Sequence, residues 1–297
     1  MKIVIAGGTG FVGKVLTSFF LNQQHDIWIL TRNPRPSSGR LHYVDWEHAL
    51  PYVQQADVVI NLAGVSLNSG RWTEERKKAI IQSRVSTTQK LVKMMKTSSK
   101  KVFINASAVG FYGTSTTETF TEASPSENND FLASTVKAWE AEALKAKEYG
   151  IRTSLTRFGI ILGQNEGALP KMILPYKLFA GGTVGSGEQW MSWVHIEDVV
   201  RIMAFIIEHE DLEGPINVTA PHPVTMKEFG QTIAKVINRP HWLPVPDFAL
   251  NILLGEMSML ILKGQRVLPQ KLCDHHYSFT YDKLEGALTH LYRSNGH

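Results

Sequence analysis

Short apolar runs alternate with longer amphipathic stretches over the first half of the chain. The apolar runs have the length and composition of β-strands and cover residues 2–6, 26–31, 41–46, 56–63, 101–107 and 153–162. Helices are predicted between them, after Gly13 and over residues 74–95 and 131–148. Such alternation is typical of parallel strands with helices on both faces of the sheet. The sequence therefore predicts an α/β fold, a doubly wound parallel sheet of the Rossmann type.

The pattern changes after Gly163, where Gly and Pro become frequent. We expect residues 1–163 to form the Rossmann domain, and residues 193–220 to return to it with a helix at 197–208 and a strand at 215–219. Residues 164–192 and 221–297 would form a smaller lobe on the substrate side. Thr225 and Glu228 have the spacing of a capping box, which predicts a helix from there to about residue 238.

A glycine-rich turn separates the first strand from the first helix. It has the pattern G-x-x-G-x-x-G, and its residues are Gly7, Thr9, Gly10, Phe11, Val12 and Gly13, with Gly8 between the first two. Glycine allows a tight turn, a close approach of backbone amides to a pyrophosphate and close packing of the helix on the sheet. Because the turn joins a strand to a helix, it predicts a dinucleotide-binding site rather than a surface turn.

The end of the second strand indicates which dinucleotide binds. An Asp or Glu at this position would accept a hydrogen bond from the 2′-hydroxyl of the adenosine ribose. The sequence instead has Thr31 and Arg32, a hydroxyl and a guanidinium suited to a 2′-phosphate. The sequence therefore favours NADP(H) over NAD(H). Asp45 and Trp46, at the end of the third strand, would flank the adenine, although Trp46 would serve equally well in core packing.

Several motifs resemble those of the extended short-chain dehydrogenase/reductases, the group that contains the nucleotide-sugar epimerases. They are AGGTGFVG at the N-terminus, NLAG at 61–64, Ser107 followed by GFYG at 110–113, RFGIILG at 157–163 and WVHIEDVV at 193–200. More narrowly, the chain is similar to the atypical subgroup called epimerase family proteins. That similarity rests on residues 71–84, 185–200 and 264–272, the last of which lie in a C-terminal extension of unknown function.

The resemblance implies further cofactor contacts. Leu62, Ala63 and Gly64 would let the backbone pass close to the cofactor, Arg84 would reach its phosphates, and Ile161 would line its site. For Arg84 a surface ion pair is the alternative.

The resemblance also implies a catalytic pattern from which this chain departs. In the wider family a Tyr, and a Lys four residues later on the helix after the fifth strand, transfer the proton. Lys137 is present, but Ala133 stands four residues before it, and residues 113–148 contain no Tyr. Ser107 and Tyr112 are then the candidates for catalysis, with Lys137 as a candidate for the nicotinamide ribose. The alternatives are a Ser that caps local backbone and a solvated Lys.

Composition excludes several classes of protein. The 297 residues are 43% apolar and 20% charged, as in globular proteins, and no apolar run reaches the roughly 18 residues of a membrane span. Since the N-terminus also lacks a signal-peptide pattern, we expect a cytoplasmic protein. The net charge of +4 comes from dispersed basic residues, which argues against nucleic-acid binding. The single cysteine excludes internal disulfides. The histidine pair at 275–276 lacks partners at metal-ligand spacing, so no metal is predicted, and His195 is expected to be structural rather than an acid or base.

Two functions fit these observations. The first is an NADP(H)-dependent oxidoreductase or epimerase that acts on a small polar, nucleotide-linked substrate held between the lobes. The second is a regulatory module that binds NADP(H) without catalysis, which the missing Tyr would explain. We also expect a homodimer that pairs the helices at 74–95 and 131–148 of two copies.

Overall fold

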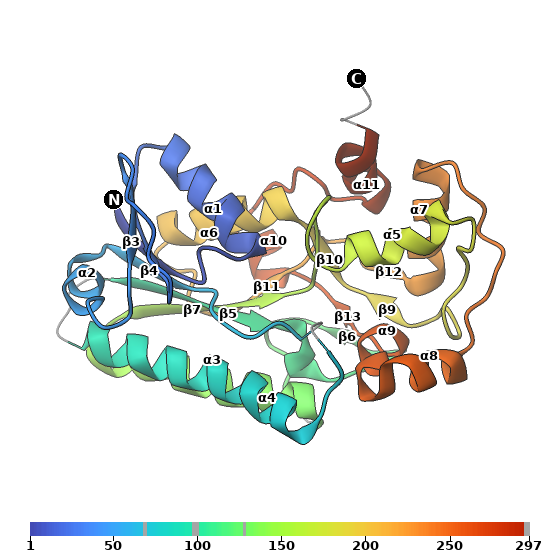
Figure 1. Cartoon of the computed structure of the whole chain (residues 1–297), viewed down its shortest axis with the longest axis horizontal. Helices are drawn as coiled ribbons and strands as arrows, with labels where there is room; N and C mark the ends of the chain where they lie inside the picture. Colours follow the sequence, from blue (N-terminus) through green and yellow to red (C-terminus); the bar gives the residue numbers. More distant parts are fainter. Residues whose placement is uncertain (68–69, 97–100, 127–128, 294–297) are drawn as a thin grey trace.

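The computed structural model describes residues 1–67, 70–96, 101–126 and 129–293. Within these residues one seven-stranded sheet has the order β11-β7-β5-β4-β1-β2-β3, with all of its pairings parallel (Figure 1). The strands are β1 Lys2–Ala6, β2 Asp26–Leu30, β3 Leu41–Val44, β4 Val58–Asn61, β5 Val102–Ala108, β7 Arg152–Phe158 and β11 Gly214–Val218. The predicted Rossmann-type fold is confirmed. Its strand order reverses between β1 and β4, and ligands of such sheets bind in the crevice at this point.

Helices cover both faces of the sheet (Figure 1). On one face α1 (Phe11–Asn22) and α6 (Ile196–Glu208) pack in a core with Ile3 and Ile5. On the other face α2 (Leu50–Gln55), α3 (Glu74–Met95) and α4 (Phe131–Leu144) pack in a core with Val4 and Ala6. Successive side chains of a strand point to opposite faces of the sheet, so the side chains of β1 are buried in both cores. This explains why the sequence of β1 is a continuous apolar run.

The last predicted strand, 153–162, is in fact two strands. β7 ends at Phe158, and β8 (Ile160–Leu162) leaves the sheet to pair with β10 (Trp193–His195). Gly159 lies at the break, where a Cβ atom would stand 2.4 Å from the carbonyl oxygen of Ser192. The close approach of the two chain segments turns the backbone away from the sheet and towards the second lobe.

The second lobe has a core of its own. It contains α5 (Leu169–Lys177), α7 (Met226–Val236) and α11 (Leu284–Arg293), together with β9 (Trp190–Met191) and β12 (Val224–Thr225). The predicted capping box at the start of α7 is present, because Thr225 and Glu228 each bond the backbone N–H of the other. Three short helices, α8 (Asp247–Leu254), η3 (Gly255–Ser258) and α9 (Met259–Leu262), follow α7.

The prediction that residues 221–297 lie wholly in the smaller lobe needs a correction. β13 (Arg266–Val267) pairs with β6 (Thr119–Phe120), which follows η1 (Val109–Tyr112) in the Rossmann half. Leu272 of α10 (Gln270–Asp274) belongs to the same core as α1 and α6, and Tyr277 and Phe279 pack against that core. The C-terminal extension therefore returns to the Rossmann half, where it packs against the core of the sheet. No helix in the described part of the chain is long and apolar enough to cross a membrane.

Candidate active site

The glycine turn closes at the carboxyl end of β1. Gly7 has a φ of +81°, and a Cβ atom there would lie 2.7 Å from the backbone of Leu62. At Gly13 a Cβ atom would lie 2.4 Å from the carbonyl oxygen of Gly7. Both positions therefore exclude any side chain, because the turn, the helix and the end of β4 are in backbone contact.

Gly10 lies in a different environment. An added Cβ atom would meet only the Gly7 carbonyl oxygen, at 3.4 Å, so the space beside Gly10 is open. α1 starts directly after it, with no side-chain cap and no acidic residue in its first turn. The first N–H groups of α1 and its positive dipole end therefore suit an anion. This space and these N–H groups are what the pyrophosphate of a dinucleotide would need, and the expected contacts Thr9, Phe11 and Val12 lie next to Gly10 in the chain.

A buried amide network holds the turn after β4. Asn61 donates from Nδ2 to Thr88 Oγ1 at 2.9 Å and to Asn105 Oδ1 at 2.7 Å, and its Oδ1 accepts from the N–H of Ala63 at 3.2 Å. The network fixes Leu62, Ala63 and Gly64 beside the glycine turn. From the sequence, only the small residues of this segment were expected to lie near the cofactor. A polar residue inside a buried strand is the sign that could have identified Asn61 as well.

Arg84 of α3 points into the space beside Gly64. A Cβ atom on Gly64 would lie 3.3 Å from the guanidinium carbon of Arg84. The guanidinium packs over the Trp139 ring at 5.2 Å and donates from one nitrogen to the carbonyls of Val65 and Ile80, both at 3.1 Å. Burial, with a smaller effect of Arg76, lowers the pKa of Arg84 to about 10. Among the described residues no carboxylate lies within 4.0 Å of it, so an anionic ligand would relieve this buried charge.

The segment after β2 leaves Arg32 at the surface. The Arg32 side chain is exposed, and the Oγ1 atom of Thr31 accepts from the N–H of Asn33 at 3.2 Å. Arg40, further along, is paired with Asp26 at 3.0 Å. The Asp45 carboxylate accepts from the N–H of His48 at 2.9 Å within its own loop. Trp46 packs in the core beside α3, one of the two roles considered for it.

Ser107 ends β5 in a buried charged network. Its Oγ donates to Glu140 Oε1 at 2.5 Å. The Arg157 guanidinium holds the same carboxylate through two bonds of 2.8 Å, from Nε to Oε1 and from Nη2 to Oε2. The side chains of Arg157 and Glu140 are only 4% and 6% exposed. Neither residue was expected from the sequence to belong to the site, although an Arg in the strand at 153–162 and a Glu on the helix at 131–148 were visible signs.

Tyr112 does not face the cavity beside Ser107. Its hydroxyl donates to Asn217 Oδ1 at 2.8 Å and accepts from Arg157 at 2.8 Å. Burial raises the pKa of this hydroxyl above its usual range, despite the neighbouring guanidinium. The residue is 3% exposed and is absent from the lining of the cavity described below. The structure thus gives Tyr112 a structural position, which corrects its assignment as the nearest replacement acid.

Lys137 also lies outside this cavity. Its ammonium group donates to Asn129 Oδ1 at 3.1 Å. Ala133, four residues earlier, is completely buried, whereas Leu132 and Val136 line the cavity at the same four-residue spacing. Thr135 and Trp139 of α4 line the cavity as well. The Thr135 hydroxyl donates to the carbonyl of Phe131 at 2.6 Å, and Trp139 Nε1 donates to Thr88 Oγ1 at 2.9 Å. The face of α4 that lines the cavity therefore includes neither Ala133 nor Lys137, and it carries no Tyr or Lys.

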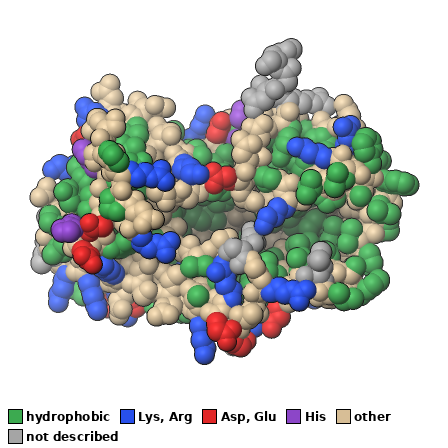
Figure 2. All heavy atoms as spheres, viewed as in Figure 1, with side chains coloured by type: hydrophobic (Ala, Val, Ile, Leu, Met, Phe, Trp, Pro, Cys, Tyr) green, Lys and Arg blue, Asp and Glu red, His purple; other side chains and the backbone are tan. Residues whose placement is uncertain are grey.

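One large cavity lies between the two lobes, with a volume of about 1000 Å³. Figure 2 shows a hollow across the molecule with hydrophobic side chains in its floor and Lys and Arg side chains near its edge. The sheet side of the lining includes Phe11, Arg84, Ser107, Phe158 and Ile161. The cavity therefore starts where the cofactor-binding turns end and continues into the smaller lobe. Among the described residues no group of three or more metal-ligating side chains is placed to hold a metal ion.

The chain matches two known families. The first is the NAD dependent epimerase/dehydratase family, over residues 3–219, and the second is DUF1731, a domain of unknown function, over residues 245–291. It is 48% identical to the epimerase family protein YfhF of Bacillus subtilis strain 168, over 98% of each chain. It is 41% identical to the epimerase family protein SAR0825 of Staphylococcus aureus, again over 98% of each chain.

Solved structures agree with these matches. The human epimerase family protein SDR39U1 (isoform 2), determined with NADPH, superposes with a TM-score of 0.91 and 29% identity over 99% of both chains. UDP-glucuronic acid 4-epimerase from Bacillus cereus has a TM-score of 0.77 at 17% identity, over 97% of this chain and 96% of that one, and shows the fold alone. Together with the strand order and the glycine turn, these findings show that the chain belongs to the NAD dependent epimerase/dehydratase family, as an epimerase family protein with a C-terminal DUF1731 domain and an NAD(P)-binding fold.

Proposed function

We propose that this protein is an NADP(H)-dependent oxidoreductase or epimerase whose substrate is held between the two lobes. The observation that carries the proposal is the continuity of the cavity. It extends from Arg84 and Ser107, at the end of the sheet where a dinucleotide would lie, into the smaller lobe. A cavity of about 1000 Å³ is at the upper end of the usual range for small-molecule sites, so a nicotinamide ring and a substrate fit together.

Two features support dinucleotide binding in general, and a third supports NADP(H) over NAD(H). Gly10 and the uncapped start of α1 leave room and free N–H groups for the pyrophosphate. Arg84 offers a buried positive charge near the phosphates, and Arg32 offers an exposed guanidinium after β2, where a 2′-phosphate would lie. The human relative was determined with NADPH, which agrees with this choice.

Ser107 is the proposed catalytic residue. When bound, the nicotinamide would accept a hydride from a carbinol carbon or give one to a carbonyl carbon. In the oxidation direction, Ser107 Oγ accepts the proton of the substrate hydroxyl while its own proton moves to Glu140, to which it is already bonded at 2.5 Å. Reduction reverses both proton transfers. Arg157 is a positioning residue, because it holds the Glu140 carboxylate without facing the substrate space.

The experiment that tests this function is a substrate panel. Purified protein is mixed with NADPH and with carbonyl compounds of different classes, including nucleotide-sugar ketones, and the loss of NADPH absorbance is followed. We expect at least one class to be reduced, with turnover lost in Ser107→Ala.

The regulatory alternative has one observation in its favour. The α4 side chains that line the cavity are those of Leu132, Thr135, Val136 and Trp139, so the Tyr and Lys of the wider family have no counterpart there. Tight NADPH binding without turnover of any class would favour a redox-sensing module over an enzyme.

We also propose a homodimer formed through α3 and α4. The exposed face of α4 presents Ala138 and Ala141, two small side chains that allow the close approach of a second helix. We expect sedimentation equilibrium to give twice the chain mass at micromolar concentration. A single species at the mass of one chain would contradict the dimer.

A further inference from the structure

We infer that the substrate of this site has an apolar body, a hydrocarbon chain or ring system that carries the reacting carbonyl or hydroxyl group. The inference deepens the proposed function and rests on it. It replaces the polar, nucleotide-linked substrate expected from the sequence by a substrate of a different chemical class.

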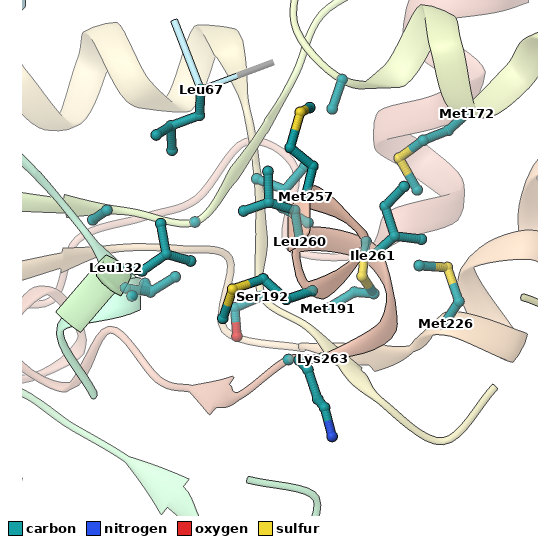
Figure 3. A pocket seen from close by; sticks show the side chains of 18 of the residues that line it. Leu67, Leu132, Met172, Met191, Ser192, Met226, Met257, Leu260, Ile261 and Lys263 are labelled. Atoms are coloured by element: carbon teal, nitrogen blue, oxygen red, sulfur yellow. The ribbon is translucent and has the colours of Figure 1, made fainter. Parts of the chain in front are cut away.

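The part of the cavity that extends beyond Ser107 is lined mainly by aliphatic and thioether side chains. They come from α5, the segment between α5 and β9, β9, α7, the loop before α8, α8, η3 and α9. They are Met172, Val184, Met191, Met226, Phe229, Ile233, Val245, Leu250, Leu254, Met257, Met259, Leu260 and Ile261. Figure 3 shows Met172, Met226 and Met257 around one common space, with Leu132 on its opposite side. Methionine adapts its shape to an apolar ligand, and five methionines in one lining therefore favour a flexible hydrophobic substrate.

Three polar side chains in this part of the lining, those of Tyr176, Trp190 and Ser192, already have protein partners. The Tyr176 hydroxyl bonds the carbonyl of Gly182 and the ring of His241. Trp190 Nε1 donates to the carbonyl of Thr116 at 2.9 Å. Ser192 Oγ donates to the carbonyl of Gln265 at 2.8 Å and accepts from the N–H of Val267 at 2.9 Å. These groups have little hydrogen-bonding capacity left for a polar substrate.

Charged side chains of the cavity lie at its edges. Arg71, Lys171 and Lys263 are exposed, and Figure 3 shows the Lys263 side chain extending away from the methionines. Arg84 lies at the opposite end, beside the proposed phosphates, and the Asp130 carboxylate caps α4 by accepting from the N–H of Ala133 at 2.8 Å. A sugar or a second pyrophosphate inside the cavity would lose its water without gaining partners, which costs free energy for every unmatched polar group. The same transfer is favourable for a hydrocarbon, because burial of apolar surface lowers the free energy.

A homologous series of ligands tests the inference on the full-length protein. We would titrate 2-hexanone, 2-octanone and 2-decanone calorimetrically, with and without saturating NADP⁺, and UDP-glucose in parallel. Because each buried methylene contributes a constant increment, we expect Kd to fall about fourfold per methylene until the cavity is filled. UDP-glucose should not compete with 2-decanone.

Substitutions in the lining test whether the ligand binds in the cavity. We expect Leu260→Asp to weaken 2-decanone binding about tenfold or more, because the carboxylate would be desolvated against the chain. Met257→Gln serves as a milder second variant in case Leu260→Asp perturbs the fold. Ile252→Gln is the matched control, because Ile252 lies on α8 of the same lobe with 73% of its surface exposed and does not line the cavity.

Three results overturn the inference: Kd values that do not depend on chain length, unchanged binding in both cavity variants, or competition by UDP-glucose. Failure of the proposed function can be distinguished from failure of this inference. If the proposed function is wrong, the wild type will not bind NADP⁺. The ketone series measured without cofactor reports on the cavity alone.

Discussion

The hydroxyl of Ser107 lies 2.5 Å from Glu140 Oε1, and this contact joins the end of β5 to α4 at the floor of the cavity. It gives the serine a proton acceptor that is itself held by Arg157. Tyr112 shares the same guanidinium but faces Asn217. The arrangement therefore favours Ser107 over Tyr112, the other candidate from the sequence, as the residue that transfers the proton.

The first prediction follows from this separation. On any substrate that the protein turns over, we expect Ser107→Ala to lower kcat about 100-fold or more, since a proton-transfer group is lost. Tyr112→Phe should keep kcat within about threefold, because its hydroxyl does not face the cavity. Steady-state NADPH oxidation measures both. A Ser107→Ala variant that keeps the kcat of the wild type would show that Ser107 does not transfer the proton.

The second prediction concerns stability. Glu140→Leu leaves the Arg157 guanidinium buried without its carboxylate, so we expect a loss of about 3–5 kcal/mol in the free energy of unfolding. Glu142→Leu is the matched control on the same helix. Its partner Lys145 is 52% exposed, and loss of that ion pair should cost about 1 kcal/mol or less. Urea denaturation followed by circular dichroism compares the two variants, and similar losses would refute the structural role of the buried pair.

The third prediction concerns cofactor choice. We expect the wild type to bind NADPH at least about tenfold more tightly than NADH, a difference of roughly 1.4 kcal/mol, because Arg32 would pair with the 2′-phosphate. Arg32→Ala should remove this difference and leave NADH binding unchanged. Isothermal titration with both cofactors decides the question, and Arg40→Ala, at a residue already paired with Asp26, is the control.

The fourth prediction distinguishes two glycines of the same turn. Gly10 has a φ of −80°, which other residues adopt, and open space beside it, so Gly10→Val should fold normally and lose NADPH binding. Gly13→Val should fail to fold stably, because its Cβ atom would overlap the Gly7 carbonyl oxygen at 2.4 Å. Circular dichroism and NADPH titration are measured together. Normal NADPH binding by a folded Gly10→Val protein would exclude this turn as the phosphate site.

The fifth prediction is a dependence of stability on pH. Burial of the ring, with smaller effects of His290 and Arg201, lowers the pKa of His195 to about 3. The unfolded chain binds a proton at this histidine below pH about 6.5, whereas the folded chain stays neutral. The His195 contribution to stability is therefore complete above that pH and decreases by up to about 1.4 kcal/mol per pH unit as the pH falls towards 3.

His195→Asn isolates this effect, since Asn also caps a helix start with an acceptor oxygen. The free energies of unfolding of the two proteins should converge as the pH is lowered from about 7 to about 5. Parallel pH profiles would mean that His195 titrates normally in the folded protein.

Local sequence determined the parts of this protein that depend on neighbouring residues. Strand and helix periodicities, the glycine turn and the Thr225–Glu228 capping box each involve residues within a few positions of one another, and the structure contains all of them. The backbone conformation at Gly7 and the packing at Gly13 permit only glycine at these positions. The motif could therefore be recognised without any knowledge of the remaining chain.

Tertiary structure alone decided the chemistry of the site. The rotation of α4 about its axis depends on packing against β5 and α3, and it turns Leu132, Thr135, Val136 and Trp139 to the cavity instead of Ala133 and Lys137. Ser107 meets Glu140, 33 residues away, and Tyr112 meets Asn217, 105 residues away. The apolar cavity is assembled from helices of the smaller lobe and the C-terminal domain. Periodicity shows which face of each helix is apolar, but which of those faces enclose a ligand depends on how distant segments pack.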